Sequence, residues 1–157
     1  MLLRGAEGNE LELAIAGYQF PDEERDPWDS NGLLVSVRVL SPEGSWSVVD
    51  PCLTTWEAKR LVSWLVHAAT REPSAAPMTF AEPNLTAVAG PVAGDPNRVQ
   101  VSASFALELR PPWAHTVAGS ANLTVDLDVR RGDLARAAAS LLSDLAEFPQ
   151  RGDDPTL

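Results

Sequence analysis

The chain has 157 residues, of which 45% are hydrophobic and 22% charged, and its 22 acidic and 12 basic side chains give a formal net charge of -10. A chain of this length buries roughly 70% of the surface of its unfolded state, so a core forms without disulfide or metal crosslinks. Its single cysteine, Cys52, excludes an internal disulfide framework. Nucleic acid and anionic membranes are excluded as partners because both require a basic surface. Without a signal-peptide pattern or a run of eighteen apolar residues, we expect a cytoplasmic protein.

Several stretches alternate apolar and polar residues with the period of a half-buried β-strand. The alternation predicts strands over 9–16, 33–39, 45–49, 99–109 and 121–129, with weaker signals over 78–81 and 85–88. Turn-forming residues at 41–44 predict a hairpin between the second and third of these. Because most of the strands have one polar face, antiparallel pairing is favoured over a parallel sheet.

Two segments change to the helical period. Apolar residues recur at three- and four-residue steps over 55–69, and Thr54 and Glu57 have the spacing of a capping box at its start. A second helix is predicted over 134–148, with Asp133 at its start and Pro149 after its end. The pattern predicts an α+β fold, an antiparallel sheet of six to seven strands with two α-helices packed on one face. We expect one domain over residues 1–157, with an ordered core over 9–149 and a frayed tail over 150–157.

Few side chains offer catalytic chemistry. The only thiol is that of Cys52, and the two histidines are His67, inside the first predicted helix, and His115, in a loop. A continuous helix separates Cys52 from His67 by on the order of 18–20 Å, too far for a proton transfer. Motifs for nucleotide binding, metal binding and serine hydrolysis are absent from the sequence. We therefore expect no enzymatic activity, no cofactor and no bound metal.

The acidic charge is concentrated near the N-terminus, where residues 1–50 hold ten acids and three bases. Five of the acids and a tryptophan lie in segment 21–31, between two predicted strands: Asp22, Glu23, Glu24, Asp26, Trp28 and Asp29. One interpretation is a solvated loop, and another is a catalytic pair of carboxylates. The third is a binding surface, on which carboxylates attract a basic protein and Trp28 is a possible anchor.

Short segments spread over most of the chain resemble, in the same order, the WapI-like immunity proteins of bacterial polymorphic-toxin systems. They are GYQFP at 17–21, WDSN at 28–31, GSWS at 44–47, DPCLT at 50–54, FAEPNL at 80–85 and LELRPPW at 107–113. The resemblance implies a small cytoplasmic protein that binds and neutralises the toxic C-terminal domain of a secreted toxin. For the family's namesake this toxin is a tRNA-cleaving nuclease.

Our leading hypothesis is therefore a non-catalytic inhibitor of a toxin domain, with a basic partner attracted by the six residues of segment 21–31. The alternative is a small-molecule-binding or structural accessory domain, whose cleft would be lined by the polar side chains Glu108, Arg110, Asp126 and Asp128. A hydrolase that uses Cys52 and His67, or two carboxylates, is the third hypothesis.

Overall fold

The computed structural model describes residues 1–73, 76–114 and 122–157. In this part of the chain eight β-strands form two four-stranded antiparallel sheets, in the orders β1-β2-β3-β4 and β5-β6-β7-β8. The first sheet contains β1 (Leu2–Arg4), β2 (Glu10–Tyr18), β3 (Gly32–Ser41) and β4 (Gly44–Thr54). The second contains β5 (Met78–Thr79), β6 (Leu85–Val92), β7 (Asp95–Phe105) and β8 (Leu123–Arg130). The helices are α1 (Thr55–Thr70) and α2 (Arg131–Glu147).

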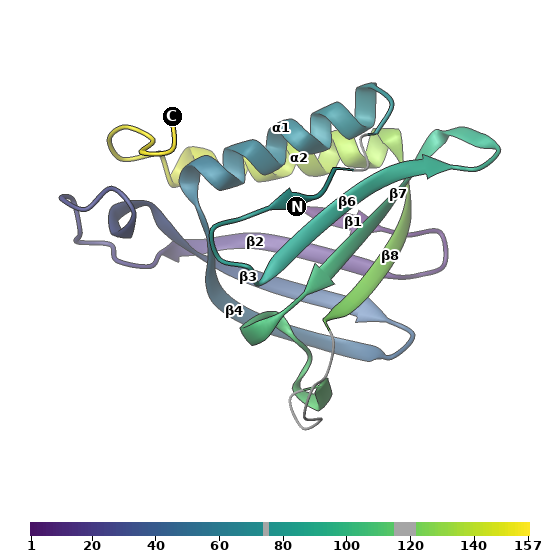
Figure 1. Ribbon diagram of the computed structural model, residues 1–157, viewed down its shortest axis with the longest axis horizontal. Helices are drawn as coiled ribbons and strands as arrows, with labels where there is room; N and C mark the ends of the chain where they lie inside the picture. Colours follow the sequence, from purple (N-terminus) through teal and green to yellow (C-terminus); the bar gives the residue numbers. More distant parts are fainter. Residues whose placement is uncertain (74–75, 115–121) are drawn as a thin grey trace.

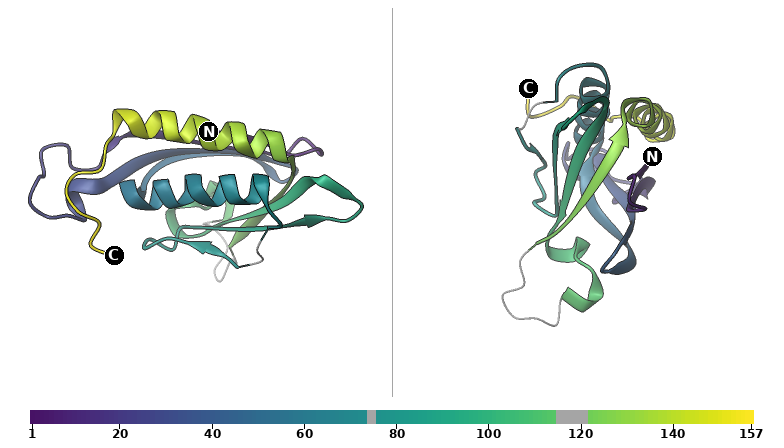
Figure 2. Two further views of the ribbon diagram at one scale, coloured as in Figure 1. Left: turned by 90° about the horizontal axis from the view of Figure 1, so that it is seen from above. Right: turned by 90° about the vertical axis from the view of Figure 1, so that its right-hand side faces the viewer.

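The two sheets pack against each other, and both helices lie side by side along one side of the pair (Figures 1 and 2). The inward faces of both sheets and the facing sides of the helices form one cluster of buried apolar side chains. Several hydrogen bonds connect the two sheets, and two of them run from side chains to backbone carbonyls. Asn9 Nδ2 donates to the carbonyl of Asp126 at 2.8 Å, and Trp46 Nε1 donates to the carbonyl of Leu109 at 3.0 Å. Neither helix is long and apolar enough to cross a lipid bilayer.

The predicted α+β class is confirmed, and the arrangement of the strands differs from the prediction. The structure has eight strands in two sheets instead of six to seven strands in one sheet. Alternation shows which face of a strand is buried, but the pattern is the same whether a helix or a second sheet covers that face. The three-residue strand β1 is also too short to produce a recognisable alternation.

The strand predicted over 99–109 ends earlier, at Phe105. Leu107 has φ = 48°, in the left-handed region that side chains other than glycine rarely adopt, and it begins a short 3-10 turn over Leu107–Leu109. The turn keeps Leu109 fully buried, so the apolar pattern continues although the strand does not. The strand predicted over 121–129 is β8, with residue 121 outside the described residues.

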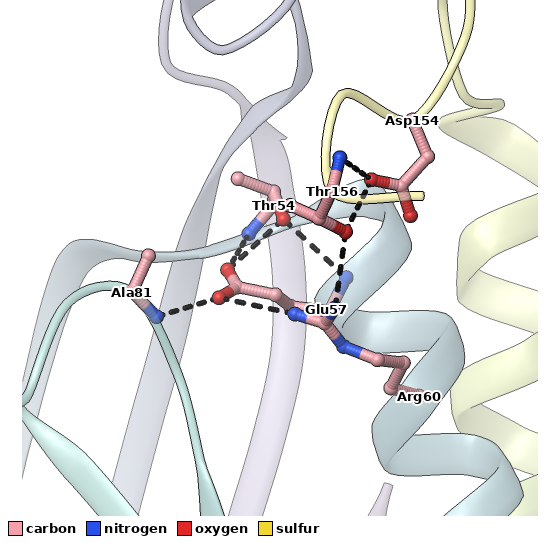
Figure 3. A network of polar contacts seen from close by, with 6 residues as sticks. All are labelled: Thr54, Glu57, Arg60, Ala81, Asp154 and Thr156. Carbon is pink, nitrogen blue, oxygen red and sulfur yellow. Dashed lines mark hydrogen bonds and ion pairs between the residues drawn. The ribbon is translucent and has the colours of Figure 1, made fainter.

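The capping box predicted at the start of α1 is present, and its glutamate is almost fully buried. The Glu57 carboxylate accepts hydrogen bonds from the Thr54 backbone and hydroxyl, both at 2.9 Å, and from the Ala81 backbone at 2.6 Å (Figure 3). Arg60 adds an ion pair at 3.5 Å. Because buried carboxylates need such partners, Glu57 holds the first turn of α1 against the segment that leads into β6.

Replacing Glu57 with glutamine turns one acceptor oxygen into an N–H donor that faces other N–H donors. We expect E57Q to lower the free energy of unfolding by about 1–3 kcal/mol, because a buried donor loses its acceptor. Urea denaturation measures this change. Glu147 is exposed in the last turn of α2, so E147Q is the matched control and should change stability by less than about 0.5 kcal/mol. Equal effects of the two variants would contradict this role of Glu57.

Candidate protein-binding surface

The segment that carries the six predicted site residues connects β2 to β3 and projects from one end of the molecule. We call residues 19–31 the acidic loop and residues 150–157 the C-terminal tail. The loop and the tail lie beside each other at the end where α1 begins (Figures 1 and 2). The structure thus brings together two segments that are more than a hundred residues apart in the sequence.

Two of the five loop carboxylates hold the loop in shape. Glu23 Oε1 accepts the backbone N–H groups of Arg25 and Asp26, at 2.7 and 3.2 Å, and these hydrogen bonds lower the pKa of Glu23. Asp26 Oδ1 accepts the backbone N–H groups of Trp28 and Asp29, at 2.8 and 3.0 Å. Glu23 and Asp26 therefore have structural roles.

The other three carboxylates, those of Asp22, Glu24 and Asp29, are exposed. Within the described part of the chain they form no hydrogen bond or salt bridge. Their charges therefore face water on a loop whose backbone is already fixed by other groups. Such an arrangement can attract a positively charged partner without first having to break internal ion pairs.

Two aromatic side chains stand among these charges. Trp28 is 41% exposed, and its ring packs edge-on against Trp56 of α1 with 5.2 Å between the centroids. Phe20 is 44% exposed, and the sequence analysis did not assign it a role. A half-exposed aromatic ring held by a buried neighbour is a typical anchor in protein interfaces. Trp56 itself is buried, and its Nε1 has no hydrogen-bond partner among the residues that the structure describes.

The buried side chain of Asn31 joins the acidic loop to the rest of the molecule. Its Nδ2 donates to the carbonyls of Pro27 and Arg151, at 2.8 and 2.7 Å. Its Oδ1 accepts the Thr55 hydroxyl at 2.7 Å and the Arg151 backbone N–H at 2.8 Å. One amide thus connects the loop, the first residue of α1 and the tail. Sequence reasoning missed this role, because a single asparagine before a strand carries no distinguishing pattern.

The C-terminal tail, for which the sequence analysis predicted fraying, makes several contacts in the structure. The guanidinium of Arg151 lies over the ring of Tyr18, 3.8 Å from its centroid, and donates to the backbone carbonyls of Pro21 and Glu23 at 2.9 and 3.0 Å. Farther along, Thr156 contacts Arg60 of α1 at 3.4 Å. The tail therefore runs from the acidic loop to the exposed side of α1.

The candidate catalytic residues are not assembled. Cys52 is buried in β4, while His67 is exposed in the last turn of α1, and His115 lies outside the described residues. Burial, with a smaller contribution from the charge of Asp50, raises the pKa of the Cys52 thiol to about 12. A nucleophilic cysteine needs the opposite shift. Among the described residues, no three His, Cys, Asp or Glu side chains are grouped to hold a metal ion.

The alternative cleft is not formed by the four residues proposed for it. Asp126 and Asp128 line a hollow of about 390 Å³ near the β1–β2 turn, which does not include Glu108 or Arg110. Asp128 is paired with Arg98 at 2.5 Å, and Asp126 accepts the Ser102 hydroxyl at 2.5 Å. Glu108 lies in the short 3-10 turn that follows β7. These side chains do not converge on one ligand.

The chain matches the immunity protein WapI-like family over residues 1–149 and belongs to it. The match covers both sheets, both helices and the acidic loop, and it ends where the C-terminal tail begins. A comparison with curated proteins found no match.

The raised pKa of Cys52 has a measurable consequence. At pH 8 a thiol with a pKa of about 12 is ionised in on the order of one molecule in ten thousand, and the thiolate is the reactive form. We expect iodoacetamide to modify the folded protein on the order of 100-fold more slowly than the urea-unfolded protein, by mass spectrometry. The rate should keep rising above pH 9, because the thiol ionises only at higher pH. Equal rates for folded and unfolded protein would show that Cys52 is accessible and ionisable.

Proposed function

Because the chain belongs to the immunity protein WapI-like family, we propose that it binds and neutralises the C-terminal toxin domain of a bacterial polymorphic or contact-dependent toxin. We propose that it acts in the cytoplasm, by occupying a surface of the toxin without catalysing a reaction. The partner is a basic protein domain, for example a nuclease, and no cofactor takes part. The acidic loop is the contact surface.

One observation carries this assignment of the surface. The acidic loop presents three unpaired carboxylates and two half-exposed aromatic rings on a backbone that its own hydrogen bonds hold in place. A nuclease needs a basic surface to hold phosphate groups, and an acidic protein that covers this surface excludes the nucleic acid. Such inhibition requires only a rigid, complementary surface, so the buried Cys52 and the distant His67 are consistent with it.

The surface is tested by reversing the three unpaired charges together, in a D22K/E24K/D29K variant. Because these side chains hold no part of the fold, the variant should unfold at the same urea concentration as the wild type. We expect its association rate constant with the purified cognate toxin domain to fall about 10- to 100-fold at low salt, with a weaker dependence on salt. Stopped-flow fluorescence at several salt concentrations measures both quantities.

The matched control reverses three exposed acids that lie at the far ends of neighbouring elements. Glu7 precedes β2, Glu43 lies in the turn before β4, and Glu72 follows α1. An E7K/E43K/E72K variant has the same net charge as the loop variant, and we expect its association rate to fall less than about threefold. If both variants slow association equally, net charge and not the acidic loop directs binding, and the assignment of the surface is wrong.

A further inference from the structure

We propose that the C-terminal tail is the second half of the toxin-binding surface and that Arg151 is a positioning residue that joins it to the acidic loop. This inference rests on the proposed function and adds to it a segment outside the family match, which ends at residue 149. The occupant is a basic segment of the toxin domain.

Arg151 is held on several sides at once. Its backbone N–H donates to Asn31 Oδ1 at 2.8 Å, and its carbonyl accepts from Asn31 Nδ2 at 2.7 Å. Its guanidinium stacks on Tyr18 and donates to the Pro21 and Glu23 carbonyls. These two carbonyls flank Asp22, and Glu23 is one of the two acids that shape the loop. Arg151 therefore fixes the backbone from which the unpaired carboxylates project.

The far part of the tail is attached to α1 through the buried Glu57. Arg60 pairs with the Glu57 carboxylate at 3.5 Å and donates to the Thr156 hydroxyl, which in turn donates to Asp154 at 2.6 Å (Figure 3). Between α1 and the tail lies an open hollow of about 650 Å³, whose charged lining residues are Lys59 and Arg60 of α1 and Asp153 and Asp154 of the tail. The tail and the first turns of α1 thus border one open hollow.

The charges of the loop and tail identify the occupant. Together the acidic loop and the C-terminal tail hold seven carboxylate side chains and two arginines, a charge of -5, which is half of the formal net charge of the whole chain. A basic polypeptide segment matches this charge, because its lysine and arginine side chains can face the unpaired carboxylates of the acidic loop.

The R151A variant distinguishes two roles of Arg151, the positioning of the acidic loop and the contribution of its charge. Removing a positive charge makes the protein more acidic, so charge alone predicts unchanged or faster association with a basic toxin domain. Loss of positioning predicts weaker binding, because the loop must then be ordered on association. Arg136 on α2 is the matched control, since it is exposed and pairs with Asp133 of its own helix, away from the loop and the tail. R136A changes the net charge by the same amount without touching the loop.

The experiment measures the dissociation constant of the purified cognate toxin domain for the full chain, R151A, R136A and a chain that ends at Pro149. We expect R151A and the shortened chain to bind about tenfold more weakly or worse, and R136A to bind within about twofold of the wild type. Amide hydrogen exchange of the free proteins is the second readout. The N–H groups of Arg25, Asp26, Trp28 and Asp29 should exchange faster in R151A and remain protected in R136A.

The possible results separate this inference from the proposed function. If R151A and the shortened chain bind as tightly as R136A while D22K/E24K/D29K binds slowly, the tail is not part of the surface, but the loop is. If hydrogen exchange in the loop is the same in R151A and R136A, Arg151 does not position the loop. If the wild-type chain does not bind the toxin domain, the proposed function is wrong, and the inference that rests on it is wrong as well.

Discussion

The end of the molecule that carries the acidic loop and the C-terminal tail depends on one buried amide, the side chain of Asn31. All its hydrogen-bonding groups are used inside the protein, by Pro27 and Ser30 of the loop, by Thr55 at the start of α1 and by Arg151 of the tail. Leaving a buried amide unpaired costs free energy. If one of the three segments moved away, Asn31 would lose hydrogen bonds, so the amide holds the segments in one relative position. The loop can therefore be long, polar and largely exposed and still have a defined shape.

This constraint gives the acids of the loop two different tasks. Glu23 and Asp26 use their carboxylates on backbone N–H groups, while Asp22, Glu24 and Asp29 remain unpaired. Like charges placed close together repel, and the fold tolerates them because the chain beneath them is fixed by Asn31 and Arg151. A basic surface that approaches the loop is attracted by these carboxylates and relieves the repulsion among them. The hydrogen bonds of Asn31 and Arg151 thus offset the repulsion among the carboxylates at the surface.

The features that were predicted from the sequence are local ones. The capping box of Thr54 and Glu57, the two helical periods and the alternation in β3 depend on residues within a few positions of each other, so the chain displays them directly. The division into two sheets depends on which strands pair, and the alternation of apolar and polar residues along a strand carries no information about its partner. The site follows the same rule. The acidic residues and Trp28 were found as a cluster in the sequence, whereas the contacts of Arg151 with Asn31 and Tyr18 span 120 residues or more and have no local pattern.

We propose that the acidic loop and the C-terminal tail together bind the toxin domain. The most direct test is hydrogen–deuterium exchange of the full chain with and without its purified cognate toxin domain, read by mass spectrometry along the whole sequence. We expect protection on binding to be concentrated in residues 19–31 and 150–157, with smaller changes in the first turns of α1. Protection confined to the outward face of the second sheet, around Ser102, Ser104 and Thr124, with the loop and tail unchanged, would contradict it.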